Sequence, residues 1–312
     1  MLQNNQSALL RLHIVVFVWG FTAILGRLIS LDAIALVWHR MLIAVAALLT
    51  YLIIRRRFRP MPLKKTLPLL GAGLIIALHW ITFFHAIKIS NVSITLAAMS
   101  TGALFASLIE PIAFKRKIDV VEIGLGVLVV GGLYLIFRAD TSHLTGILVA
   151  LSSAFLSALF SVVNGKLVEK HAPISITTYE LIGGVTGITI FMALTGRINE
   201  SLFALGTCTE SGFWSFLGGY CDLSMLLILG ILATAWAFIE SVDVMRFLRP
   251  YTVVLTINME PIYGIILAFL FFGESEKMEP LFYLGTLIII GALFVEAYVK
   301  RKRRKKVSET IA

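Results

Sequence analysis

Residues 251–272 read YTVVLTINMEPIYGIILAFLFF, an apolar run whose only charged side chain is Glu260. A helix needs about 20 such residues to cross the roughly 30 Å hydrocarbon core of a bilayer. Glu260 stands near the middle of the run, where a charge costs at least about 2.5 kcal/mol. The stretch therefore predicts a transmembrane helix that carries a carboxylate close to the bilayer midplane.

Similar runs fill most of the chain. Of its 312 residues, 58% are hydrophobic and 14% charged, and the mean hydropathy of +0.92 excludes an ordinary soluble domain. The first run lacks the flanks of a signal peptide and counts as a span. We expect transmembrane helices at 9–29, 34–54, 67–87, 92–114, 120–137, 144–165, 174–194, 223–245, 251–272 and 280–299. The predicted fold class is an all-α integral membrane protein with ten transmembrane helices.

The 27 Lys and Arg residues indicate orientation, although the net charge of +9 could also favour nucleic acid. With the N-terminus inside, the inner side receives Arg11, Lys166, Lys170, Arg246, Arg249 and the bases within 55–65, 115–117 and 300–306. The outer side receives only Arg27, Lys88, Arg138, Arg197 and Lys277. The positive-inside rule then predicts a multi-pass protein of a bacterial-type inner membrane with both termini cytoplasmic. We expect the basic tail to touch anionic lipid headgroups and no nucleic acid.

Both cysteines, Cys208 and Cys221, fall in the longest predicted connection, residues 196–222 on the outer side. An oxidising compartment would permit a disulfide between them. The neighbouring aromatic side chains equally suit two unpaired cysteines at the headgroup level. The sequence leaves both alternatives open.

The two halves of the chain match each other at constant offsets. Trp80, Lys88 and Asn91 align with Phe238, Arg246 and Arg249, and Arg40 aligns with Glu180. Each half has an odd number of predicted helices, so the second enters the membrane from the opposite face. This pattern predicts two inverted five-helix repeats at 1–138 and 139–299, followed by a basic cytoplasmic tail at 300–312.

A run near the C-terminus resembles the second-half signature of the EamA-type members of the drug/metabolite transporter superfamily. It comprises Asn258, Glu260, Pro261, Tyr263, Gly264, then Phe272, Gly273, Glu274, Gly285 and Gly291, and Trp19 and Gly20 also fit. The resemblance covers nearly the whole chain. In the first half, Lys115 and Arg116 stand where the repeat would place Gly and Glu. The resemblance implies a ten-helix carrier of amino acids, other metabolites or drug-like compounds, often working by export.

Glu260 is the deepest carboxylate in the sequence, about 14 Å from the end of its predicted helix. Pro261 removes a backbone donor and predicts a kink in this helix. Interrupted helices at the midplane are typical of transporter binding sites. We therefore expect Glu260 to act on the substrate or ion pathway, with a purely structural role as the alternative. Asn258 and Tyr263 belong to the same run and join the candidate pathway residues.

Further candidates come from polar and aromatic residues within spans. Trp236 and Glu240 are four residues apart, which predicts one helix face running toward the cytoplasm. Arg40 and Glu180 occupy matching places with opposite charge, and their expected heights differ by about 12 Å, which disfavours a salt bridge. Trp19 and Trp80 complete the candidate set, although isolated aromatics are often simple packing residues.

The function predicted is secondary transport of small organic solutes, with export as its direction, by alternating access between the halves. The sequence contains no zinc-protease motif, no nucleophile elbow and no phosphate-binding loop, so we expect no enzyme, ATP-driven pump, cofactor or metal. A membrane-embedded enzyme and a channel are the alternatives. A channel fits less well, because a midplane acid in an inverted repeat is typical of a gated carrier.

Overall fold

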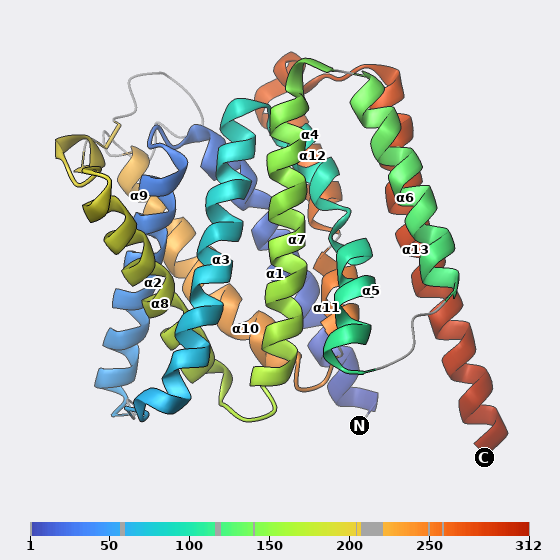
Figure 1. Cartoon of the computed structure of the whole chain (residues 1–312), viewed down its shortest axis with the longest axis horizontal. Helices are drawn as coiled ribbons and strands as arrows, with labels where there is room; N and C mark the ends of the chain where they lie inside the picture. The colour runs from blue at the N-terminus through green and yellow to red at the C-terminus, as the bar shows by residue number, and fades with distance from the viewer. Residues whose placement is uncertain are drawn as a thin grey trace.

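The computed structural model describes residues 2–56, 60–115, 120–139, 141–203, 205–206, 221–248, 250–257 and 259–311. Over these residues the chain is helical, with no strand. Ten passes run along a common direction, and α1 begins at the same end of the bundle at which α13 finishes (Figure 1). The prediction of ten transmembrane helices is confirmed.

The first half contains five passes, one of them broken. They are α1 (Leu2–Leu28), α2 (Ala33–Ile54), α3 (Leu63–Ile89), α4 (Val92–Met99) with α5 (Gly102–Ala113), and α6 (Val120–Ala139). Side-chain caps fix two of the starts, since Asp32 accepts from the backbone N–H groups of Ile34 and Ala35, and Asn91 accepts from that of Ile94.

The second half repeats this arrangement. Its passes are α7 (Leu144–Leu167), α8 (Pro173–Leu194), α9 (Cys221–Leu227) with η4 (Ile228–Trp236) and α10 (Ala237–Val244), α11 (Pro250–Ile257) with α12 (Glu260–Phe272), and α13 (Pro280–Ile311). Short 3₁₀ turns, η1 (Thr141–His143), η2 (Glu200–Phe203) and η5 (Gly273–Glu276), lie in the connections. Helix α13 continues through the basic tail as far as Ile311.

The fourth pass of each half is interrupted, at corresponding places. Between α4 and α5 the hydroxyls of Ser100 and Thr101 donate to the carbonyls of Leu96 and Ala98, and side-chain bonds of this kind compete with the helical ladder. Between α11 and α12 the backbone makes a tight turn from Met259 N–H to Thr256 O at 3.0 Å. Pro261 lies in the first turn of α12, where a missing donor costs little.

Close backbone contact joins several passes. A Cβ on Gly73 of α3 would come within 1.9 Å of the carbonyl oxygen of Glu180 on α8, so only glycine permits this approach. At one edge of the bundle α6 and α13 lie side by side (Figure 1), and a Cβ on Gly132 would come within 2.7 Å of the Gly285 carbonyl oxygen.

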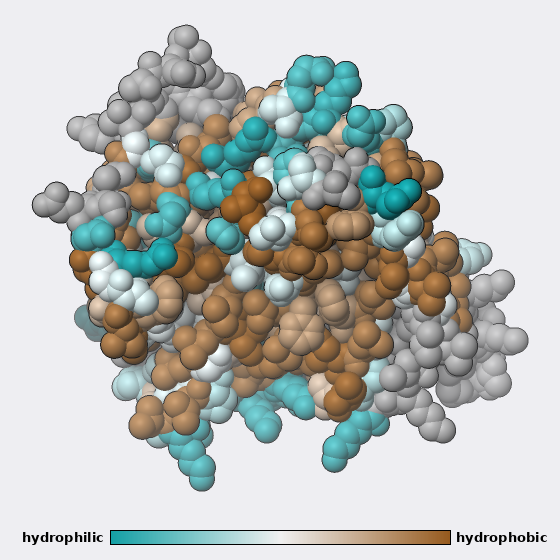
Figure 2. Space-filling view, turned by 45° about the horizontal axis from the view of Figure 1, so that its top comes forward, coloured by the Kyte–Doolittle hydropathy of each residue, from teal (hydrophilic) through white to brown (hydrophobic). Residues whose placement is uncertain are grey.

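The outer surface matches a hydrocarbon solvent. Large apolar side chains such as Leu10, Ile54, Leu194 and Leu270 are more than half exposed. Figure 2 shows hydrophobic side chains forming a broad band across the visible face, with hydrophilic ones gathered toward its two ends. Within the described residues, seven helices are long and apolar enough to cross a membrane, and shorter apolar helices cover Gly124–Arg138 and Pro280–Ala292. The structure is that of a multi-pass membrane protein.

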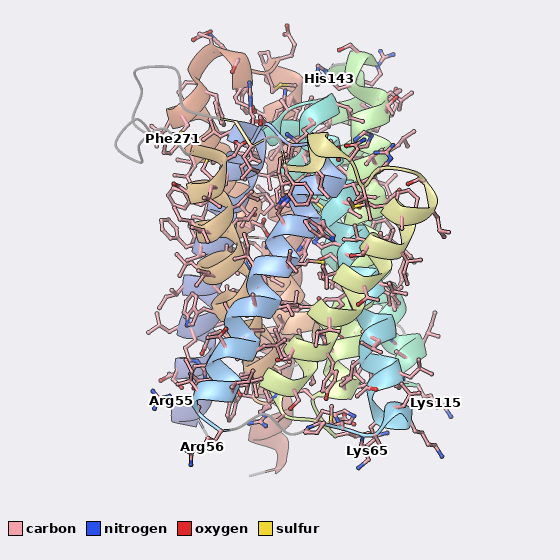
Figure 3. All side chains as sticks on the ribbon, turned by 90° about the vertical axis from the view of Figure 1, so that its left-hand side faces the viewer. Arg55, Arg56, Lys65, Lys115, His143 and Phe271 are labelled. Carbon is pink, nitrogen blue, oxygen red and sulfur yellow. The ribbon has the colours of Figure 1, made fainter. Side chains whose placement is uncertain are left out.

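Basic side chains concentrate at one end of the bundle. Arg55, Arg56, Lys65 and Lys115 lie together at that end, whereas His143 lies at the other (Figure 3). We call the first the basic end and the second the opposite end. Helix α1 begins at the basic end, so Arg11 lies toward it and Arg27 toward the opposite end.

Candidate functional site

A cavity of about 60 Å³ lies inside the bundle between the two halves. Its polar lining consists of Thr22, Arg40, His79, Ser157, Ser161, Ser241 and Glu260. Its aromatic lining consists of Trp19, Trp80, Phe83, Phe160 and Phe238. A pocket with mostly apolar walls and a few convergent polar groups is the usual form of a small-molecule site.

Arg40 is the cationic group of the cavity. Its side chain is 2% exposed, and its guanidinium carbon lies 3.9 Å above the ring of Trp80. Its Nε donates to the hydroxyl of Thr234 at 2.5 Å. The stacked ring and the hydroxyl hold the guanidinium plane in place, and a desolvated cation–π contact of this kind stabilises by about 2 kcal/mol.

Glu260 supplies the opposite charge. It occupies the first residue of α12, after the interruption of the ninth pass, and its charge interacts with that of Arg40. The described residues form no ion pair within 4 Å between these two groups, and both line the cavity. One charge therefore comes from the first half and the other from the second, with space between them.

The eighth pass departs from regular α-helix beside the cavity. Residues Ile228–Trp236 form a π-helix, η4, which is rare and often found at functional sites. Within it the carbonyl of Ala233 accepts from the indole N–H of Trp19 at 2.9 Å and lies 3.5 Å from a guanidinium nitrogen of Arg40. The widened helix thus offers a backbone acceptor that orients two lining side chains.

His79 is tied to the wall of the cavity. Its Nδ1 lies 3.0 Å from the carbonyl oxygen of Ser153, and the Ser153 hydroxyl donates to the His79 carbonyl at 2.8 Å. These bonds join α3 to α7. His79 therefore acts mainly as a fixed structural link beside the cavity.

Charged contacts join α1 to α10 toward the basic end. Arg11 donates through Nε to Glu240 at 2.6 Å and through a terminal nitrogen to Asp243 at 2.7 Å. Side chains of all three residues are 24% to 36% exposed. The contact spans the two halves, because α1 belongs to the first and α10 to the second.

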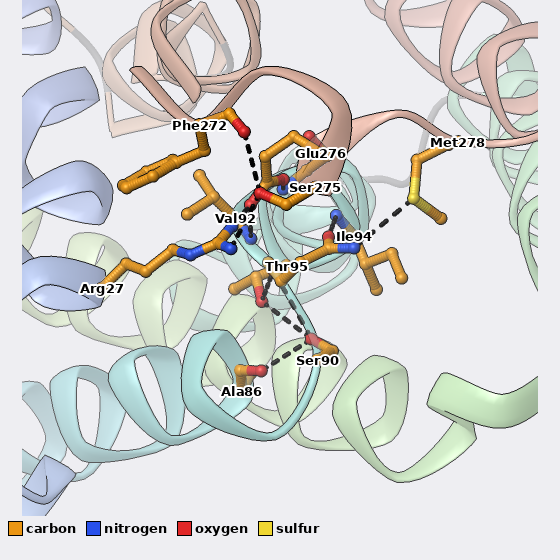
Figure 4. Close-up of polar contacts among 12 residues, drawn as sticks. Arg27, Ala86, Ser90, Val92, Ile94, Thr95, Phe272, Ser275, Glu276 and Met278 are labelled. Atoms are coloured by element: carbon orange, nitrogen blue, oxygen red, sulfur yellow. Dashed lines mark hydrogen bonds and ion pairs between the residues drawn. The ribbon is translucent and has the colours of Figure 1, made fainter. Parts of the chain in front are cut away.

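A second charged contact lies toward the opposite end (Figure 4). Arg27 forms an ion pair with Glu276, whose side chain is fully buried. Glu276 also accepts from the backbone N–H groups of Val92 at 3.2 Å and Ser93 at 2.9 Å, at the N-terminus of α4. A carboxylate at this position is favoured by the helix dipole. The network fastens α1 and α4 to η5, which again joins the two halves.

The predicted site residues separate into two groups. Trp19, Arg40, Trp80 and Glu260 meet at the cavity. The remaining described candidates lie elsewhere.

Glu240 pairs with Arg11, and Tyr263 packs its ring edgewise on Phe17 at 5.6 Å. Trp236 is 39% exposed on the outside, and Glu180 is buried in α8 away from the cavity. Asn258 lies outside the described residues, as does Cys208. Cys221, which opens α9, is a disulfide cysteine.

Three residues of the cross-half contacts, Arg11, Arg27 and Glu276, are not predicted as site residues from the sequence. In the sequence, Arg11 and Arg27 serve only to predict the orientation of the chain in the membrane. Glu276 has no predicted role. The one available signal is that Glu276 follows a predicted apolar span closely, and many surface acids do so. Their partners lie more than 200 residues away in the chain.

Comparison with known proteins places the chain among transporters. The model described as the EamA-like transporter family matches residues 6–138 and again 144–297. An uncharacterized transporter, YdfC of Bacillus subtilis, is 22% identical over 86% of this chain and 82% of that protein. An uncharacterized transporter of Archaeoglobus fulgidus is 24% identical over 52% of each chain. A solved crystal structure has the same fold, with a TM-score of 0.63 and 14% identity over 95% of this chain and 98% of that one.

Proposed function

Because the chain belongs to the EamA-like transporter family, we propose that this membrane transporter carries small zwitterionic organic solutes, of which amino acids are the simplest, by alternating access between its halves. The observation that carries the proposal is the placement of Arg40 and Glu260 in one cavity. A solute carboxylate would meet the guanidinium, and a solute ammonium would meet the carboxylate. Family membership points to transport rather than to catalysis.

The aromatic walls favour a solute with an apolar part. Trp80 and Phe238 lie with ring centroids 5.7 Å apart, and Phe160 stacks on Phe238 at 5.4 Å. The cavity volume of about 60 Å³ is well below the several hundred Å³ of drug-sized pockets. In this conformation the site therefore suits a small metabolite, and a drug-like compound would require it to widen.

Alternating access is supported by the two charged contacts. Arg11 with Glu240 and Asp243 joins the halves at the basic end, and Arg27 with Glu276 joins them at the opposite end. In the structure both contacts are formed, and each joins the two halves at one end of the bundle. Opening one contact while the other stays formed would expose the cavity to one side at a time.

The orientation we propose places the basic end in the cytoplasm of a cell with a bacterial-type inner membrane, following the positive-inside rule. Export is the proposed direction, as the resemblance to drug/metabolite transporters implies. The repeats we propose are residues 1–138 and 139–299.

Counterflow in proteoliposomes tests the function. Vesicles containing the purified chain are loaded with an unlabelled amino acid mixture and diluted into a labelled one. A carrier accumulates label transiently, because inward and outward movement share one site. A channel gives no overshoot, and the absence of any uptake of amino acids contradicts the solute class.

A further inference from the structure

A buried polar cluster lies apart from the cavity, on α7 and α8. Asn164, Thr177 and Glu180 are each 0% exposed. The carboxamide of Asn164 lies beside the carboxyl group of Glu180. Both carboxyl oxygens of Glu180, both polar atoms of the Asn164 amide and the hydroxyl of Thr177 nevertheless lack a hydrogen-bond partner among the described residues. Buried polar groups are nearly always satisfied, so five such atoms together require an explanation.

Glu180 has no ion-pair partner among the residues that the structure describes. Ionisable groups on the surrounding helices include Lys65 and His79 on α3, Arg40 on α2, Lys166 on α7, Tyr179 on α8 and Glu240 on α10. None of them forms an ion pair with Glu180 within the described structure.

Four of these groups have other partners. Arg40 binds Thr234, His79 binds Ser153, Glu240 binds Arg11, and the Tyr179 hydroxyl accepts from the backbone of Met61. An ionised carboxylate buried without a cation or donors is strongly disfavoured.

The chemistry of the cluster identifies what would satisfy it. A protonated carboxyl group presents one O–H donor and one carbonyl acceptor, and a carboxamide presents N–H donors and one acceptor. A small adjustment that brought the two groups face to face would allow two hydrogen bonds, acid to amide oxygen and amide to acid oxygen. An ionised Glu180 would leave the oxygen of Asn164 without a donor. One proton therefore satisfies four of the five unpartnered atoms.

We infer that Glu180 and Asn164 form a proton-binding site, with Glu180 carrying the proton and Asn164 as its partner, and that this proton couples to solute movement. The coupling rests on the proposed transport function. The chemical step is the breaking of the carboxyl O–H bond, with the proton passing to water and the electron pair staying on Glu180. No other reactant is needed.

The position of the cluster gives it a route to the cavity. Ser157 and Ser161 line the cavity, and Asn164 follows them on the same face of α7, within about one turn of Ser161. On the other side, the backbone of Glu180 touches Gly73 of α3, the helix that carries Trp80. Formation and loss of this pair would make and break a link between α7 and α8 beside the wall of the solute site.

Infrared difference spectroscopy of the full-length protein in lipid bilayers tests the site with pH as the only probe. Raising the pH should remove carbonyl-stretching bands of protonated carboxyl groups. Glu180→Gln, which can still pair with Asn164, should lack one band component of the wild type. The matched control is Glu274→Gln, since Glu274 is 81% exposed and pairs with Lys277 at the surface. Persistence of every wild-type component in Glu180→Gln overturns the proposal.

A second variant covers the case in which Glu180→Gln does not fold. Asn164→Ala keeps the carboxyl group and removes its partner, so the same component should shift in frequency. An unmoved band overturns the pairing.

In proteoliposomes, a pH gradient should drive amino acid accumulation in the wild type and at least tenfold less in Glu180→Gln. Accumulation driven equally well in that variant, or driven by sodium alone in the wild type, overturns the coupling. If the wild type shows no amino acid counterflow but the Glu180 band is present, the proposed solute class is wrong and the proton site stands.

Discussion

Arg27 and Glu276 form an ion pair that fastens the last turn of α1 to η5, and Glu276 simultaneously holds the N-terminus of α4. At the other end of the same helix, Arg11 is held by two acids of α10. Helix α1 thus connects the two cross-half contacts and lines the cavity between them through Trp19 and Thr22. A single rigid helix with a charged contact at each end is suited to link the opening of one side to the closing of the other.

The first prediction concerns these two contacts. Glu276→Gln removes the charge at the opposite end, and Arg11→Gln removes it at the basic end. A cysteine placed at Thr22 in the cavity should react roughly tenfold faster with an impermeant thiol reagent from the opposite side in Glu276→Gln, a shift of about 1.4 kcal/mol. In Arg11→Gln the increase should appear from the basic side. Equal acceleration from both sides in either variant would show that the contacts hold the fold together rather than gate it.

The second prediction concerns the charge exchange of Arg40 and Glu180. Arg40 interacts with Glu260 and stacks on Trp80, whereas Glu180 lies beside Asn164. We therefore expect that the double variant Arg40→Glu, Glu180→Arg stays as inactive in counterflow as either single variant. Comparison of the three at matched protein amounts in the membrane measures this. Recovery of wild-type rates by the double exchange would show that the two residues pair directly.

Features of the fold that depend on neighbouring residues are predictable from the sequence, whereas those that depend on contacts between distant residues are not. Hydropathy is summed over about 20 consecutive residues, so the ten passes emerge from local sequence alone. The break after α4 depends on hydrogen bonds from the hydroxyls of Ser100 and Thr101 to backbone carbonyls. The same residues could also form an unbroken helix. The residue types alone therefore do not distinguish a broken helix from an unbroken one.

The site illustrates the same limit. Trp19, Arg40, Trp80 and Glu260 stand out in the sequence because polar and aromatic groups within apolar runs are few, and all four reach the cavity. The expectation that Trp236 shares a face with Glu240 assumes 3.6 residues per turn. The π-helix that ends at Trp236 has a different period, and this side chain is 39% exposed. Pairings such as Arg11 with Glu240 depend on the packing of distant helices.

The third prediction concerns orientation. Lys65 lies at the basic end and His143 at the opposite end (Figure 3). In a background with both native cysteines replaced by serine, Lys65→Cys should react with an impermeant thiol reagent only from the cytoplasmic side and His143→Cys only from outside. Intact cells and inverted vesicles provide the two sides. The reverse pattern would invert the proposed topology while leaving the fold unchanged.

The fourth prediction concerns how the cavity recognises a solute. If Arg40 binds the carboxylate, Arg40→Gln should weaken apparent affinity at least tenfold for an amino acid but leave affinity for the corresponding amine, which has no carboxylate, nearly unchanged. Arg40→Lys should recover part of the loss, because it keeps the charge but not the planar stacking on Trp80 at 3.9 Å. Inhibition of counterflow by each compound gives the affinities. Equal losses for both compounds would place Arg40 in a structural role.

The fifth prediction concerns Glu260, whose carboxylate opens α12 beside the cavity and interacts with Arg40 across it. Glu260→Gln keeps the shape of the side chain and removes its charge, so membrane insertion and protein amount should stay near wild type. The ammonium of a zwitterionic solute would lose its counter-charge, and a charge-assisted hydrogen bond of this kind contributes about 1.5–3 kcal/mol. We therefore expect apparent affinity for an amino acid to fall by roughly ten- to a hundredfold. The matched compound is the corresponding carboxylic acid, which has no ammonium. Its affinity should be unchanged or higher in Glu260→Gln, because the opposing carboxylate is gone. The free energies of the four combinations of protein and solute form a cycle whose coupling term isolates the contact between Glu260 and the ammonium. A coupling term near zero, with transport rates equal to those of the wild type, would show that Glu260 only supports the helix and that the solute binds elsewhere.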